Sequence, residues 1–225
     1  MDSGLLLFDG VPGSGKTTTS RQVSETIKAS AGRCGWALEE GKDHPFFGPG
    51  VRRRHREDDY DDRCLERWRL AVEQAAGQVW VLEGCALQST VRYMFEQDWE
   101  RERIDRYWER CIEVLAAVPV RLVYFRHRDV ETFIRSHTLK VRADVWEKIS
   151  THVVGTRVGA RLIEQSVEDV PVDFWVRYSH LCDDLVDRFS HPVLNLDVAD
   201  GWDLAAAQVE AWLDEMPGEP STPRR

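Results

Sequence analysis

The segment Gly10-Val-Pro-Gly-Ser-Gly-Lys16-Thr17 is the strongest indication of the fold in this sequence. It has the spacing G-x-x-x-x-G-K-[ST], with a further glycine at Gly13. Glycines let the backbone turn tightly so that several N–H groups converge on one phosphate, and a helix expected to begin near Lys16 adds the positive end of its dipole. The apolar run Leu5–Asp9 precedes the stretch, as a buried strand does in this motif. The stretch therefore predicts a phosphate-binding loop.

Two side chains of this loop have expected roles toward a nucleoside triphosphate. Lys16 is expected to bridge the β- and γ-phosphates, and the Thr17 hydroxyl is expected to be a ligand of Mg²⁺. ATP and Mg²⁺ are therefore the expected cofactors. The residues of this segment predicted to bind them are Gly10, Gly13, Ser14, Gly15, Lys16, Thr17 and Thr18.

Short apolar runs separated by helical stretches continue along the chain. The runs typical of buried strands are Leu5–Asp9, Gly35–Glu39, Val79–Glu83, Val120–Phe125 and Pro192–Leu196. Helical patterns cover residues 16–30, 63–76, 86–117, 143–166, 172–189 and 203–215, and Asp129 is a candidate N-cap. Alternating strands and helices predict an α/β fold, a five-stranded parallel sheet with helices on both faces.

The organisation expected from this pattern is one domain over residues 1–216 with a helical lid at about 126–145. Residues 217–225 are rich in Pro and polar residues and are expected to be a disordered tail. The apolar run at residues 5–8 is too short for a signal sequence, and nothing approaches the roughly 20 apolar residues of a membrane span. The expectation is a cytoplasmic protein with no membrane partner.

The net charge and the spacing of the cysteines and histidines argue against nucleic-acid-binding and transition-metal-binding proteins. The formal net charge of −9 argues against a general nucleic-acid binder, which would carry a basic face. The basic run Arg52–Arg56 is followed at once by acids at 57–59 and 61–62, which favours mutual neutralisation in solvent; a part in binding the acceptor is the alternative. The five cysteines and seven histidines show no metal-ligand spacing, so reduced thiols and no transition-metal site are expected.

Carboxylates at the expected carboxyl ends of strands are candidates for the chemistry. Glu83 closes the third run, where an acid can lie beside Mg²⁺ or one of its waters. Glu39 and Glu40 follow the second run, and one of them is the candidate base for the proton of an attacking hydroxyl. Two interpretations stay open for Asp9, just before the loop: a contact with the loop or substrate, or a buried structural contact.

Basic residues after the fourth run are candidates for stabilising charge on a transferred phosphoryl group. The catalytic candidates are Arg126, Arg128 and Arg135. Lys140 and Arg142 would complete a mobile lid over the phosphates and are predicted to bind the nucleotide. A solvated helix face is the alternative interpretation of this basic segment.

The loop, the succession of strands and the basic stretch after the fourth strand resemble the nucleoside and nucleotide kinase group of P-loop proteins, which includes thymidylate kinases and deoxynucleoside kinases. Asp9-Gly10 is similar to the acid–Gly pair that opens the loop in those kinases, and Glu39 or Glu40 falls at the place of the deoxynucleoside kinase base. The resemblance, over about residues 4–215, implies a P-loop kinase fold with a lid and transfer of the γ-phosphoryl group of ATP·Mg to a small acceptor. It also implies adenine near residues 195–202.

The chain departs from the pattern of these families at Gly84. Glu83-Gly84 falls where they carry an acid–Arg pair, and Arg92-Tyr93 is a candidate replacement at a different spacing. Small-molecule phosphotransferases that inactivate or build antibiotics share the scaffold. The expected acceptor is therefore a small molecule that offers a hydroxyl or a phosphate, with nucleosides, nucleotides and natural products as options.

A P-loop switch or ATPase module is the alternative function. A guanine-reading switch would need an NKxD motif after a strand, and the sequence has none. A motor or assembly ATPase would usually carry a signature loop or an oligomeric arginine finger, and neither is evident. A homodimer is left open.

Overall fold

The computed structural model describes residues 3–39, 41, 44–46, 55–197, 201–202 and 204–215. In this part of the chain five strands form one sheet in the order β2-β3-β1-β4-β5, and every pairing is parallel. The strands are β1 (Gly4–Gly10), β2 (Cys34–Ala37), β3 (Val79–Glu83), β4 (Val120–Phe125) and β5 (Val193–Leu196). The predicted α/β fold with a five-stranded parallel sheet is confirmed.

The strand boundaries agree with the sequence pattern to within one residue, except at the end of the second strand. It ends at Ala37, paired with Leu82, rather than continuing to Glu39. β2 is an edge strand with one neighbour, so its chain leaves the sheet where pairing with β3 stops. Glu39 therefore lies in the segment beyond the strand rather than in the sheet itself.

The helices follow the predicted stretches but are divided more finely. The α-helices are α1 (Lys16–Ala31), α2 (Tyr60–Ala75), α3 (Arg92–Glu96), α4 (Arg101–Leu115), α5 (Val130–Phe133), α6 (Leu139–Val141), α7 (Ala143–Val154), α8 (Arg157–Glu164), α9 (Val170–Val186) and α10 (Ala205–Glu215). Two π-helical turns are η2 (Leu87–Val91) and η3 (Ile134–Thr138). The predicted N-cap is confirmed, since the Asp129 carboxylate accepts the Thr132 N–H at 2.9 Å.

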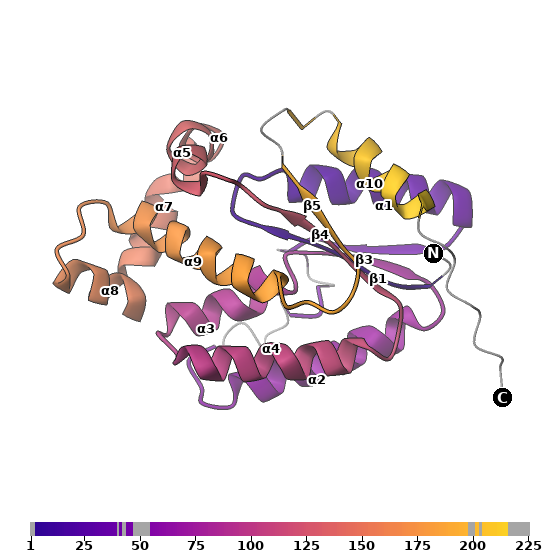
Figure 1. Ribbon diagram of the computed structural model, residues 1–225, viewed down its shortest axis with the longest axis horizontal. Helices are drawn as coiled ribbons and strands as arrows, with labels where there is room; N and C mark the ends of the chain where they lie inside the picture. Colours follow the sequence, from indigo (N-terminus) through magenta and orange to yellow (C-terminus); the bar gives the residue numbers. More distant parts are fainter. Residues whose placement is uncertain are drawn as a thin grey trace.

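Alternate residues of β1 contribute to two cores, one on each face of the sheet. Leu5 and Leu7 belong to a cluster with side chains of α2, α4 and α9, whereas Leu6 and Phe8 pack with α1 and α10. Successive side chains of a strand point to opposite faces, so a central strand covered on both sides must be apolar throughout. All of β1 is buried accordingly. Figure 1 shows α1 and α10 on one side of the sheet, with α2 and α4 on the other.

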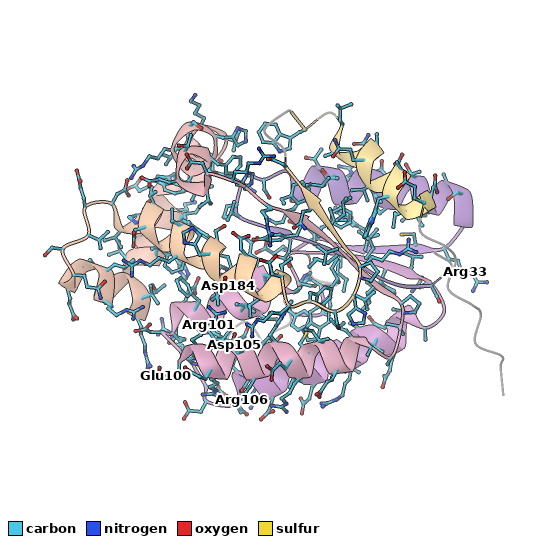
Figure 2. All side chains as sticks on the ribbon, viewed as in Figure 1. Arg33, Glu100, Arg101, Asp105, Arg106 and Asp184 are labelled. Atoms are coloured by element: carbon cyan, nitrogen blue, oxygen red, sulfur yellow. The ribbon has the colours of Figure 1, made fainter. Side chains whose placement is uncertain are left out.

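Ion pairs join α4 to α9 on the outside of the larger core. Arg101 lies 2.9 Å from the Asp105 carboxylate on its own helix and 3.0 Å from that of Asp184 on α9. Figure 2 shows these labelled side chains together between the two helices. Exposed pairs of this kind stabilise a fold by at most about 1 kcal/mol each, so the apolar contacts beneath them hold the helices.

Because all strands run in one direction, their carboxyl ends share one edge of the sheet. Phe8 pairs with Glu83, and Gly10 pairs with Phe125, so the beginning of the glycine-rich loop lies beside the end of β3 and of β4. No helix among the described residues is long and apolar enough to cross a bilayer. The predicted tail at 217–225 lies outside the described residues.

Candidate active site

The loop between β1 and α1 has the backbone geometry of an anion cradle. Gly15 is the N-cap of α1 and has a φ of +94°, a left-handed conformation that side chains rarely adopt. Since it has no side chain to cap the helix, N–H groups of the first turn of α1 remain available to an anion. A Cβ atom at Gly15 would lie 2.3 Å from Cδ1 of Trp202. Glycine is therefore required both for the turn and for the close approach of this ring.

Lys16 is folded against the loop from which it comes. Its ammonium group donates hydrogen bonds to the carbonyl oxygens of Gly10, at 3.0 Å, and Val11, at 3.1 Å, and the side chain is buried. The Ser14 hydroxyl is also buried and has no hydrogen-bond partner among the described residues. Thr18 is exposed on α1. The loop thus holds one buried cation and one unsatisfied hydroxyl beside the helix N-terminus, which suits a phosphate group.

Thr17 and Glu83 provide the oxygen atoms that suit a magnesium ion. The Thr17 hydroxyl donates to Glu83 Oε1 at 3.1 Å, and Glu83 is buried at the end of β3. Mg²⁺ prefers oxygen ligands and is usually held by one or two protein groups together with phosphate oxygens and water. Among the described residues no cluster of three or more His, Cys, Asp or Glu side chains offers a complete metal site. The hydroxyl and carboxylate fit an ion that arrives with a triphosphate.

A cavity of about 810 Å³ opens beside this pair. It brings together five of the residues predicted from the sequence: Lys16, Thr17, Glu39, Glu83 and Arg142. The rest of its wall is made by Pro12, Leu38, His55, Gln88, Arg92, Tyr93, Val145, Lys148, Ile149, His152 and Trp175. Glu40, the other candidate base, lies outside the described residues. The cavity therefore extends from the phosphate loop to a mixed polar and apolar wall large enough for a second small molecule.

Glu39 is held close to Glu83 in this cavity. Its backbone N–H donates to Glu83 Oε2 at 3.2 Å. Burial, together with the nearby carboxyl groups of Glu83 and Asp9, raises the pKa of the Glu39 carboxyl to about 7, although Lys16 and Arg92 act to lower it. A carboxyl group with a pKa near neutrality is suited to accept a proton from a hydroxyl.

Gly84 permits the position that Glu39 occupies. A Cβ atom at Gly84 would lie 2.8 Å from Glu39 Oε2, and the glycine has a φ of +67°. At the position where the kinases that the sequence resembles have an arginine, the Glu39 carboxyl group therefore lies over the backbone of a glycine. An acidic side chain thus occupies the place expected for a basic one.

Replacing Gly84 by alanine is expected to displace Glu39. The left-handed backbone alone should cost about 1–2 kcal/mol of stability, and the contact with the carboxylate should reduce turnover more than nucleotide binding. Thermal unfolding and ATP titration would separate the two effects. The matched control is Gly77→Ala, where a Cβ atom would meet nothing within 4 Å. Full turnover in the Gly84 variant would contradict the close packing.

The open question about Asp9 is resolved in favour of a structural contact. Its buried carboxylate accepts the backbone N–H groups of Ala86 at 2.9 Å, Leu87 at 3.0 Å and Gln88 at 3.2 Å. Burial raises its pKa to about 6, although these hydrogen bonds act to lower it. Asp9 thus fixes the start of η2 at the end of β3, directly behind the phosphate loop.

Arg92 lines the cavity. A residue that replaces the arginine absent at Gly84 would have to lie there. Arg92 is not free to bind an anion alone, because Nη1 lies 3.0 Å from Glu96 and Nε donates to the Gln88 carbonyl at 3.0 Å. Glu96 also pairs with His152 at 3.0 Å. Most of the positive charge of Arg92 is therefore balanced by Glu96 within the cavity wall.

Comparisons with known proteins agree with this geometry at the level of the fold. No protein-family model matches the chain, and no curated protein matches it in sequence. A crystal structure of thymidylate kinase from Ehrlichia chaffeensis superposes with a TM-score of 0.57 at 12% sequence identity, covering 95% of this chain and 99% of that chain. The chain has the fold of a thymidylate kinase.

Within this thymidylate kinase fold, the three arginines predicted to be catalytic do not line the cavity. Arg126 is 2.5 Å from Asp187, Arg128 is 93% exposed and 3.3 Å from its acidic partner on the chain after β5, and Arg135 is 2.8 Å from Asp169. Each arginine is engaged by a carboxylate from a later segment. The structure therefore brings Arg142 to the cavity and leaves these three outside it.

The segment predicted to be a lid is helical and contacts the phosphate loop. The Thr138 hydroxyl of η3 donates to the Pro12 carbonyl at 3.0 Å, and Arg142 follows at the cavity wall, whereas Lys140 is exposed and does not line it. The same loop is also contacted by Trp202, whose indole N–H donates to the Ser14 carbonyl at 2.9 Å. No motif in the sequence marks Thr138. Trp202 ends the segment where the family resemblance implies adenine, but no motif marks its contact with the loop.

Proposed function

We propose that the protein is an ATP-dependent phosphotransferase that moves the γ-phosphoryl group of ATP·Mg to a hydroxyl of a small-molecule acceptor. One observation supports this proposal: the half-buried carboxyl group of Glu39 shares a cavity with Lys16 and Thr17 of the phosphate loop. Glu83 lies between them, because its carboxylate accepts hydrogen bonds from the Thr17 hydroxyl and from the Glu39 backbone N–H. The arrangement has a donor side and an acceptor side. A protein that only binds a nucleotide has no need of the second, and hydrolysis needs an acceptor space no larger than a water molecule.

On the donor side, the loop N–H groups and Lys16 would hold the phosphates. A magnesium ion bound with the nucleotide, next to Thr17 and Glu83, would neutralise charge on the β- and γ-phosphates. Arg142, at the lid end of the cavity, is placed to add a further positive charge. These groups favour the transition state because its charge lies on the transferred oxygens.

On the acceptor side, Glu39 favours a hydroxyl over a phosphate. A hydroxyl carries no charge and needs a base for its proton, whereas a phosphate is already an anion and needs a cation beside it. The group leaning over Gly84 is a carboxylate, and the nearby Arg92 is already paired with Glu96. Nucleosides and natural-product alcohols remain the options for the acceptor.

The proposal is tested with purified protein, ATP·Mg and matched pairs of acceptors, each as the free alcohol and as its phosphate. Thymidine and thymidylate form one pair, because the similar structure is a thymidylate kinase by name. Other pairs are nucleosides, sugars and antibiotic alcohols, with ³¹P NMR of the products. Transfer to an alcohol is the expected result. ADP release that no acceptor raises would favour a P-loop ATPase, and tight GTP binding without transfer would favour a switch.

A further inference from the structure

His44 lies in the segment after Glu39 and is buried at the carboxyl end of β3, with 2% of its surface exposed. Its Nε2 atom is 3.1 Å from the Glu83 carbonyl oxygen and 2.9 Å from the Cys85 sulfur. Its Nδ1 atom is 3.3 Å from the backbone nitrogen of Phe46. The imidazole thus joins residues 44–46 to the end of the third strand.

These contacts select one form of the ring. The Phe46 N–H can only donate, so Nδ1 must offer a lone pair and carry no proton. In the neutral ring the hydrogen is then on Nε2, which donates to the Glu83 carbonyl, with the Cys85 sulfur as a second acceptor. A hydrogen on Nδ1 would set two donors against each other in a buried site.

Glu83 is anchored at three points, and two of them involve the segment after β2. Its carboxylate accepts from the Thr17 hydroxyl and from the Glu39 N–H, while its carbonyl accepts from His44. Since the pairing of β2 with β3 ends at Ala37, the sheet does not hold Glu39 in place. The chain beyond the strand is held instead by the contacts with Glu83.

Two backbone hydrogen bonds connect the residues around Glu39 with His44. The Gly41 N–H donates to the Leu38 carbonyl at 2.7 Å, and the His44 N–H donates to the Gly41 carbonyl at 3.1 Å. Phe46 then packs against Trp68, with ring centroids 4.7 Å apart. The described part of the segment is therefore held at two points, at Glu39 by the Glu83 carboxylate and at His44 by the Glu83 carbonyl.

We propose that His44 is a positioning residue that keeps Glu39 in place beside the phosphate loop by binding the Glu83 carbonyl. The inference rests on the proposed phosphotransfer and assigns no contact with substrate to His44. A misplacement of the base by about 1 Å would reduce turnover by about 10²-fold, whereas binding of ATP depends on the loop and should not change.

The test compares His44→Gln with His44→Phe. Glutamine can place an N–H donor close to the position of Nε2, whereas phenylalanine fills the space without a donor. We expect His44→Gln to retain most of kcat, and His44→Phe to lose about 10²-fold in kcat with the Kd for ATP·Mg unchanged. Phe46→Leu is the matched control, because it weakens the packing of the same segment and keeps the hydrogen bond. It should lower the melting temperature without a comparable loss of kcat.

Several outcomes would overturn the positioning role. One is normal kcat in a folded His44→Phe variant, and another is a kcat that falls in Phe46→Leu as far as in His44→Phe. If His44→Phe does not fold, ¹⁵N NMR of the wild-type imidazole decides, since a hydrogen on Nδ1 would exclude the Glu83 contact. A wild-type protein that transfers phosphate to no acceptor would refute the proposed function instead, whatever the His44 ring shows.

Discussion

Replacing Lys16 by alanine is expected to reduce kcat for phosphoryl transfer by about 10²- to 10³-fold or more. The ammonium group is the buried cation of the phosphate loop, and a preorganised charge aimed at a transition-state oxygen has an effect of that size. The measurement is ADP release with a saturating acceptor, together with the affinity for ATP·Mg. Both should fall, because Lys16 is expected to contact the phosphates before and during transfer.

The effect must be separated from unfolding, because the same ammonium group bonds to the Gly10 and Val11 carbonyls. Lys16→Met keeps much of the side-chain volume and should show the same loss with a smaller change in stability. Lys28→Ala is the matched control, since Lys28 is exposed near the other end of the same helix. A folded Lys16 variant that turns over normally would refute the assignment of the loop.

The sheet, and the position of the glycine-rich loop between a strand and a helix, could be predicted because their signals are local. The loop is defined by residue types at fixed spacing, and each buried strand is a short apolar run next to a turn. Val79–Glu83 and Val120–Phe125 have the predicted bounds. In a parallel sheet such runs must end at one edge, so the proximity of Glu83 to the loop follows from topology alone.

The partners of the arginines could not be predicted from the same signals. Arg126 directly follows β4, as the sequence indicates, but its carboxylate partners are Asp183 on α9 and Asp187 directly after this helix. Whether a side chain at a strand end turns into the ligand cavity or out to a helix depends on tertiary packing. Arg142 was one of several equivalent basic residues in the sequence, and only the position of α7 brings it to the cavity.

The contacts around Glu39 could not be predicted from the sequence either. Gly84 looked like the loss of a functional arginine, whereas in the structure it is the space into which the Glu39 carboxylate fits. His44 had no motif, because its role depends on the carbonyl of a residue in another strand. The significance of such positions comes from contacts between segments that are distant in the chain.

Replacing Glu39 by glutamine is expected to reduce kcat by about 10²- to 10⁴-fold, the usual contribution of a general base. Binding of ATP·Mg should change little, since the loop and Thr17 are intact. Glu40→Gln is the matched control. It changes the other candidate acid of the sequence by the same chemistry, and it should remain active if Glu39 is the base. A loss confined to the Glu40 variant would reverse the assignment.

The ionisation of Glu39 should raise kcat and lower the stability of the fold as pH increases. The carboxyl accepts a proton only when ionised, so kcat should rise with pH and level off above its pKa of about 7. In the unfolded chain the group ionises near 4.5, so the unfolded state binds fewer protons between 4.5 and 7, and stability falls as pH rises through this window. The Glu39→Gln variant has no ionising group at this position and should not lose stability in this way. The inactive Glu39→Gln variant should therefore unfold at a higher temperature than the wild type at pH 8 and lose this advantage near pH 4.5. Equal stability at pH 8 would mean that burial of the carboxyl costs the native state nothing, and the predicted rise in kcat near pH 7 would lose its physical cause.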